Sequence, residues 1–120
     1  MSASLYERLG GAQGIGSIVD DILAHHLVNP IIKARFENIA DLEHARQMAV
    51  EFFTAGAGGP LQYTGRDMRT AHRGMNISEQ EYLAAMDDIM GALAKHDIDE
   101  ATRKDVLAIL YALKGDIIRV

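Results

Sequence analysis

The sequence contains no cysteine among its 120 residues. This absence excludes disulfide bridges, zinc–thiolate centres, iron–sulfur clusters and cysteine nucleophiles. Tryptophan is absent too, and aromatic residues make up only 6% of the chain, whereas hydrophobic residues make up 48%. The core is therefore expected to be mainly aliphatic, with contributions from the six methionines. We expect a single domain spanning residues 1–120, because two domains would each have too small a core.

Basic residues and long apolar runs are also scarce. Lys and Arg number 12 against 17 Asp and Glu, which gives a net charge of -5. Because a nucleic-acid-binding surface needs a basic patch or stripe, this balance argues against a nucleic-acid partner. No apolar run is long enough to span a bilayer, and the opening "MSASLYERLGG" lacks the basic and apolar regions of a secretory signal. We expect a cytoplasmic protein with no membrane partner, as a monomer or a weak dimer.

Four segments carry apolar residues at the helical period. The first spans about residues 12–28, and the second follows Asp41, a plausible N-cap. The third opens with Ser78-Glu79-Gln80-Glu81, which has the pattern of a capping box, and the fourth begins near Asp99. The β-branched residues all lie on helical stripes, so no strand is predicted. The fold class is therefore all-α, with the apolar stripes buried in one core.

Glycine and proline separate these helices, and one connection is unusually long. Gly10-Gly11 ends a short leading turn, Asn29-Pro30 ends the first long helix, and "AGAGGP" at residues 55–60 ends the second. The connection that follows continues to the capping box and contains His72. Connections of that length are usually functional or disordered. This one is rich in apolar residues, so we expect it to pack against the helices.

His72 is the residue in this connection that is best suited to catalysis or metal binding. An imidazole serves as an acid or base, as a hydrogen-bonding core residue or as a metal ligand. No Ser–His–Asp or Glu–His spacing indicates an acid–base pair, and a protein-only metal site would need further ligands. His25 and His26 are adjacent on one helix and point about 100° apart, so they do not form such a site. Haem brings four nitrogens of its own and needs only one histidine. The alternative is a surface histidine in a loop.

Three stretches carry a specific resemblance. "SLYERLGG", "VEFFTAGAGGPLQYTGRDM" and "AHRGMNIS" resemble the corresponding segments of the truncated haemoglobins, most closely group I, and the likeness extends over the whole chain. The resemblance implies a globin-like two-over-two helical sandwich around haem b, with a proximal helix of about one turn. It places His72 at the iron-ligating position and Phe36 where a phenylalanine contacts the haem.

The resemblance also implies a haem pocket. Its apolar walls are expected from large side chains and its propionate donors from Tyr and Arg. The expected cofactor-binding residues are Phe36, Arg46, Met48, Phe52, Phe53, Tyr63, Arg66, Met68, Arg69, Met75, Met86 and Ile89. Arg66 and Arg69, with Arg73, could alternatively be a solvated basic cluster. His26 is expected to form a hydrogen bond in the core, and His25 and His96 are expected to face solvent.

The distal side departs from the family pattern. The family usually carries a tyrosine and a glutamine or other polar residue there, which donate hydrogen bonds to the ligand. The corresponding pocket residues in this chain are apolar: Ile22, Leu23, Ala45, Ala49 and Ala85. Without a donor, we expect fast oxygen release and a pocket open to bulky ligands. His44 and Met48 share a helix face, so either could alternatively occupy the sixth iron position.

The leading hypothesis is a haem b protein that binds diatomic ligands (oxygen, CO and NO), with oxygen binding or transport as the family role. One alternative is a haem redox enzyme, acting as an NO dioxygenase, a nitrite reductase or a peroxidase and supplied with electrons by an external reductase. Another is a haem-free helical interaction module. The sequence does not decide whether the chain is an enzyme. A sensor is disfavoured because 120 residues leave no room for an output domain.

Overall fold

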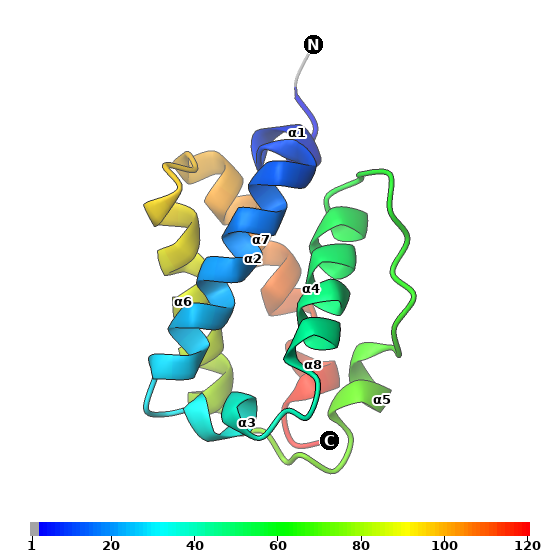
Figure 1. The fold of residues 1–120 in the computed structure, drawn as a ribbon, viewed down its shortest axis with the longest axis vertical. Helices are drawn as coiled ribbons and strands as arrows, with labels where there is room; N and C mark the ends of the chain where they lie inside the picture. Colours follow the sequence, from blue (N-terminus) through cyan, green and yellow to red (C-terminus); the bar gives the residue numbers. More distant parts are fainter. Residues whose placement is uncertain (1–2) are drawn as a thin grey trace.

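The computed structural model describes residues 3–120, so the first two residues of the expected domain lie outside the described part. Its helices are labelled in Figure 1. Their bounds are α1 Leu5–Arg8, α2 Gly11–Val28, α3 Lys33–Glu37, α4 Leu42–Gly56, α5 Met68–His72, α6 Glu79–Lys95, α7 Glu100–Ala112 and α8 Lys114–Ile117. Within residues 3–120 the sole β-type pairing is an isolated bridge between Ile77 and Ile118. The prediction of an all-α fold is therefore confirmed.

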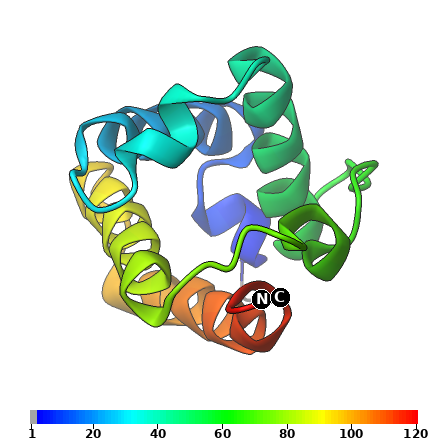
Figure 2. The ribbon, with the colours of Figure 1, turned by 90° about the horizontal axis from the view of Figure 1, so that it is seen from below.

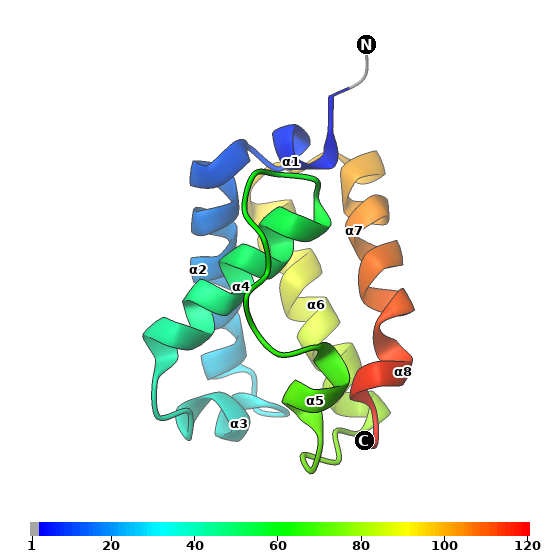
Figure 3. The ribbon, with the colours of Figure 1, turned by 90° about the vertical axis from the view of Figure 1, so that its right-hand side faces the viewer.

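The four long helices form two packed pairs, α2 with α4 and α6 with α7. Contacts between α2 and α6 join the two pairs. Viewed from below, these helices and the short α3, α5 and α8 surround the middle of the molecule (Figure 2). The chain between α4 and α5 runs back along α4, which brings α5 beside α8 (Figures 1 and 3). The short α5, from the middle of the chain, thereby packs against the C-terminal helix α8.

The predicted helix starts are confirmed by their capping hydrogen bonds. The Asp41 carboxylate accepts from the His44 backbone N–H at 3.0 Å. Ser78 and Glu81 form the expected capping box, in which each side chain accepts from the other residue's backbone N–H. Such caps satisfy amide groups that the first turn leaves without partners. Gly10 has a φ of 94°, a value that side-chain-bearing residues rarely adopt, so a glycine is needed where α1 turns into α2.

The core lies mainly between α2, α6 and α7. Ile15, Val19 and Leu93 are at most 1% exposed and form its centre. α4 differs from these helices, because its only buried side chains are Glu51 and Thr54. Its apolar face is therefore only partly covered by other protein groups. That incompletely covered face is the first structural sign of a binding site.

Three details differ from the sequence predictions. The fourth segment is not one helix, because the chain changes direction at Leu113 between α7 and α8. α3 was not predicted, since five residues are too few to show a helical period. The prediction that His96 faces solvent is wrong: its Nε2 lies 2.6 Å from an Asp21 oxygen, and its side chain is only 26% exposed. His25 is likewise half-buried.

In residues 3–120, every helix is too short or too polar to cross a lipid bilayer.

Candidate functional site

A large cavity opens between the helices. Its volume is about 860 Å³, which lies within the range of roughly 300–1,000 Å³ found for ligand and cofactor sites. Residues of all the helices except α1 contribute to it, together with the chain before and after α5. The lining residues are His26, Ile32, Arg35, Phe36, Ile39, His44, Ala45, Met48, Ala49, Phe52, Phe53, Tyr63, Thr64, Gly65, Arg66, Met68, Ala71, His72, Met75, Ile77, Glu81, Tyr82, Ala85, Met86, Ile89, Leu110, Leu113 and Ile117.

One wall of the cavity is a single face of α4. Ala45, Met48, Ala49, Phe52 and Phe53 follow the spacing of one helical stripe and all line the cavity. These side chains are half-buried and face the cavity, and Ala49 and Phe53 also pack against the edge of the core. A stripe of this kind normally packs into a protein core. Here it offers an apolar wall to a large planar or bulky apolar molecule.

The wall formed by α5 carries His72. The helix begins at Asp67, whose carboxylate accepts from the Thr70 backbone N–H at 3.3 Å. The Nδ1 of His72 lies 2.8 Å from the carbonyl oxygen of Met68. Because a carbonyl oxygen only accepts, Nδ1 must carry the proton and donate it. The Nε2 of the neutral ring then holds a free lone pair, which is the form in which histidine binds a metal.

A buried carboxylate holds the chain that leads to α5. Glu51 of α4 accepts from the Thr64 backbone N–H at 2.9 Å and from the Thr64 hydroxyl at 2.7 Å. Gln47 donates to its other oxygen at 2.9 Å. These hydrogen bonds lower the pKa of Glu51, with the largest contribution from the Thr64 side chain. Glu51 therefore holds the chain between α4 and α5 in place ahead of His72, a role that the sequence analysis did not predict.

Tyr63 and Arg66 lie at the same side of the cavity. The Tyr63 hydroxyl donates to the Arg66 carbonyl oxygen at 2.7 Å, and its ring meets Phe52 edge to face at 5.7 Å. Burial raises the pKa of Tyr63. Gly65 makes this arrangement feasible, because a Cβ there would lie 2.5 Å from the Tyr63 hydroxyl and 2.9 Å from the Met48 sulfur. The glycine thus allows the loop to close over the end of the α4 wall.

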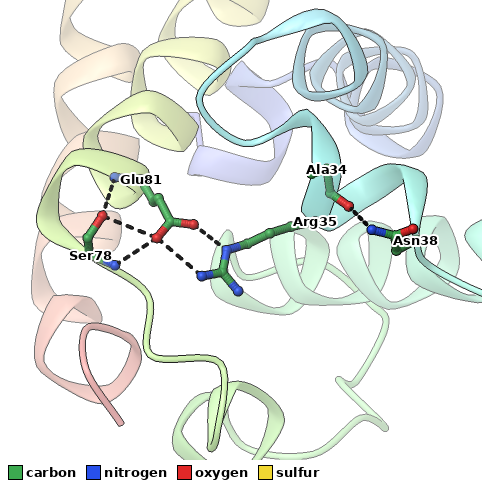
Figure 4. A network of polar contacts seen from close by, with 5 residues as sticks. All are labelled: Ala34, Arg35, Asn38, Ser78 and Glu81. Carbon is green, nitrogen blue, oxygen red and sulfur yellow. Dashed lines mark hydrogen bonds and ion pairs between the residues drawn. The ribbon is translucent and has the colours of Figure 1, made fainter.

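An ion pair joins α3 to the start of α6 across another side of the cavity. Arg35 donates to both carboxylate oxygens of Glu81 through Nε and Nη2, and both residues line the cavity (Figure 4). Glu81 also accepts from the backbone N–H and hydroxyl of Ser78. The hydrogen bond from Arg35 is the main reason that the pKa of Glu81 is lowered. α3 carries Phe36, so the pair also holds this aromatic side chain in place.

Most of the predicted pocket residues line the cavity. They are His72, Phe36, Met48, Phe52, Phe53, Tyr63, Arg66, Met68, Met75, Met86, Ile89, Ala45, Ala49 and Ala85. Four predicted residues do not line it. Arg46 pairs with Asp20 on α2, and Arg69 lies 3.4 Å from Asp116. Ile22 is buried in the core, and Leu23 is half-buried against it.

The structure adds cavity residues that sequence reasoning did not assign to it. Arg35 and Ile39 lie in or next to the short α3, where no period is visible. Leu110, Leu113 and Ile117 come from the C-terminal helices, whose apolar stripe was assigned entirely to the core. In residues 3–120 no group of three or more His, Asp or Glu side chains could hold a metal ion. The cavity-lining histidines of these residues form no such group, so a histidine such as His72 instead suits a cofactor that carries its own metal ligands.

Comparison with known proteins identifies the class. A family model described as "Bacterial-like globin" matches residues 4–119, so the chain belongs to that family. A group 1 truncated hemoglobin of Tetrahymena thermophila is 31% identical, covering 87% of this chain and 94% of its own length. One from Tetrahymena pyriformis is 25% identical over 96% of this chain and 94% of its own length. The crystal structure of the latter's Fe(III) form shares the fold with a TM-score of 0.93, at 24% identity, covering 98% of this chain and all of that one.

The protein is thus a truncated, two-over-two globin of group I type. Globins hold haem b and bind diatomic ligands at its iron, and this membership confirms the expected cofactor and fold. The residues present fit the group. The cavity is lined largely by apolar side chains, and His72 is held in the tautomer that leaves Nε2 free.

Proposed function

We propose that His72 is the proximal ligand of the haem iron and that diatomic ligands bind on the side formed by α4. The observation that carries this proposal is the 2.8 Å contact between His72 Nδ1 and the Met68 carbonyl oxygen. It fixes the tautomer and the ring orientation, and such a hydrogen bond also raises the basicity of the ligating nitrogen. When bound, the haem supplies the iron at which the gas is held. The chain supplies one nitrogen and an apolar enclosure.

The side chains that line the cavity from the middle of α4 carry no hydrogen-bond donor on the ligand side, whereas His44 lies near the exposed start of the helix. Ala45 and Ala49 line the cavity from this helix, and Ala85 of α6 lines it from another side. A hydrogen bond to a polar ligand such as oxygen contributes roughly 0.5–1.5 kcal/mol and more where charge develops. In its absence, we propose fast release of oxygen and a relative gain in affinity for carbon monoxide. The small alanine side chains also leave room for larger ligands.

The test is an absorption spectrum of the ferric, ferrous and carbon monoxide forms, recorded for the native chain and for His72→Ala. The native protein should bind haem stoichiometrically with a histidine-ligated ferrous spectrum. His72→Ala should lose haem rapidly, and added imidazole should restore the ferrous spectrum by replacing the missing ring. His96→Ala is the matched control, because His96 pairs with Asp21 away from the cavity. A His72→Ala protein with the native ferrous spectrum would contradict the proposal.

The same spectra test whether a side chain of α4 takes the sixth position. His44 and Met48 both line the cavity. We propose that neither ligates the iron, because Met48 packs toward Gly65 and His44 is exposed near the start of α4. A high-spin or water-bound ferric spectrum is expected. A low-spin ferric spectrum that Met48→Leu or His44→Leu abolishes would refute this part of the proposal.

A further inference from the structure

The cavity contains one deeply buried polar ring that the proposed haem ligation does not use. His26 of α2 is only 5% exposed and lines the cavity. Its ring stacks on Phe36 with centroids 4.5 Å apart and an angle of 27° between the planes. His26 was expected to form a hydrogen bond in the core. The structure shows that bond but also places the residue at the cavity wall.

The hydrogen bonds of His26 determine which nitrogen carries its proton. Nδ1 lies 2.7 Å from Oδ2 of Asp88 on α6. Asn29 donates to both oxygens of the same carboxylate at 3.2 Å, which holds it in position. An ionised carboxylate only accepts, so Nδ1 is the protonated nitrogen. Nε2 has no hydrogen-bond partner among residues 3–120. It is also absent from the fully buried side-chain atoms that lack a partner, so part of its surface is accessible.

Burial keeps this imidazole uncharged near neutral pH. Removal from water lowers the pKa of His26, and this effect outweighs the opposing influence of Asp88. His25, the other titratable neighbour on α2, also lowers it. The neutral ring therefore presents a bare lone pair on Nε2, which is a hydrogen-bond acceptor and not a donor.

We propose that His26 Nε2 is a selectivity-determining acceptor in the wall of the cavity, and that it favours neutral hydroxyl-bearing molecules of the phenol class. The inference rests on the proposed function, because the haem shares this cavity. A phenol ring that lies beside Phe36 can donate its O–H to Nε2, because Phe36 and His26 are adjacent in the cavity lining. Oxygen and carbon monoxide have no proton to donate, so His26 does not compensate for the missing distal donors.

A site built to pair with a hydroxyl rejects an analogue that lacks it, because the buried acceptor is then left without a partner. Phenol and anisole are a suitable pair of probes, since methylation removes the O–H donor, keeps the ring and the oxygen, and adds one methyl group. We expect the haem-loaded ferric protein to bind phenol roughly tenfold more tightly than anisole, as a difference of about 1.4 kcal/mol implies. His26→Phe should preserve an aromatic ring beside Phe36 but bind both probes equally. His25→Phe, on the same helix but outside the cavity lining, should keep the preference.

A second variant reverses the polarity of the ring without removing it. In Asp88→Asn, an amide that turns its N–H₂ group toward His26 Nδ1 keeps the hydrogen bond from Asn29 on its remaining oxygen, since Asn29 lies 3.2 Å from both oxygens at position 88. Nδ1 must then accept, so Nε2 becomes the protonated donor. The preference for phenol over anisole should fall, and oxygen release should slow because the cavity has gained a donor. Nitrogen NMR of the imidazole reports the tautomer directly in both proteins.

The outcomes separate this inference from the proposed function. A protein that shows no histidine-ligated haem spectrum refutes the proposed function. A protein with that spectrum that binds phenol and anisole equally, or binds neither, refutes the role of His26 alone. The finding of an Nε2-protonated tautomer in the native chain would refute it as well, and this measurement needs no variant to fold.

Discussion

At the scale of single residues, Ala49 is the position where one side chain should change ligand release most. It lines the cavity from the middle of the α4 face, whereas Leu23, also an expected distal residue, does not reach the lining. In Ala49→Gln the new amide should donate to bound oxygen. A hydrogen bond of about 1.4 kcal/mol corresponds to roughly tenfold slower oxygen dissociation. Stopped-flow or flash-photolysis measurements of the dissociation rate check this.

Ala49→Leu is the control for that experiment, because it adds bulk without a donor. It should leave oxygen dissociation within a few-fold of the native rate. The explanation based on a missing donor is wrong if the glutamine variant releases oxygen as fast as the leucine variant.

At the scale of elements, the ion pair between Arg35 of α3 and Glu81 of α6 should affect haem retention more than the free energy of unfolding. Arg35 joins Glu81 beside the cavity, and Arg46 joins Asp20 outside its lining. The two arginine side chains have similar exposure, 31% and 33%. Partly exposed ion pairs contribute about 0–1 kcal/mol, so Arg35→Ala and Arg46→Ala should lower the free energy of unfolding by similarly small amounts.

The two variants should differ in how fast they lose haem. Arg35→Ala frees α3, and with it Phe36, so transfer of haem to an excess of apomyoglobin should accelerate several-fold. Arg46→Ala should transfer haem at the native rate, because its guanidinium lies outside the cavity lining. Equal acceleration in both variants would instead indicate a general loosening of the fold.

At the scale of the whole molecule, we expect acid to destabilise the fold in two steps. The pKa of His26 is lowered from 6.5 in the folded state, so the unfolded chain binds a proton that the folded chain does not. The free energy of unfolding should therefore fall as the pH drops below about 6.5. The contribution of His26 to this fall should end near its folded-state pKa. The lowered pKa of Glu81 adds a second loss that begins near its usual value of 4.5.

Urea unfolding of the haem-loaded native chain and of His26→Phe, measured between pH 7.5 and pH 4, separates the two steps. The difference in unfolding free energy between them should change with pH below 6.5 and be constant above it. A difference that does not vary with pH would show that His26 does not carry the first step.

The starts of the long helices and the all-α class followed from the sequence, because helical period and capping chemistry are local properties. The Ser78–Glu81 capping box, the Asp41 N-cap, the glycine-rich turns and the apolar face of α4 all fall where those local rules place them. The singular position of His72 in a long apolar connection, together with the quoted motifs, also sufficed to predict a haem-binding globin. Its ligation of the iron is still a prediction.

The tertiary structure alone decided which apolar faces meet other helices and which meet the cavity. Periodicity shows that a face avoids water but not what covers it, so the stripes of α2 and α4 looked alike in sequence. Packing placed Ile22 and Leu23 in or against the core and directed Arg46 toward Asp20. It also brought Arg35, Glu81 and His26 to the cavity from segments distant in the chain. Their roles depend on contacts between helices, which no local pattern encodes.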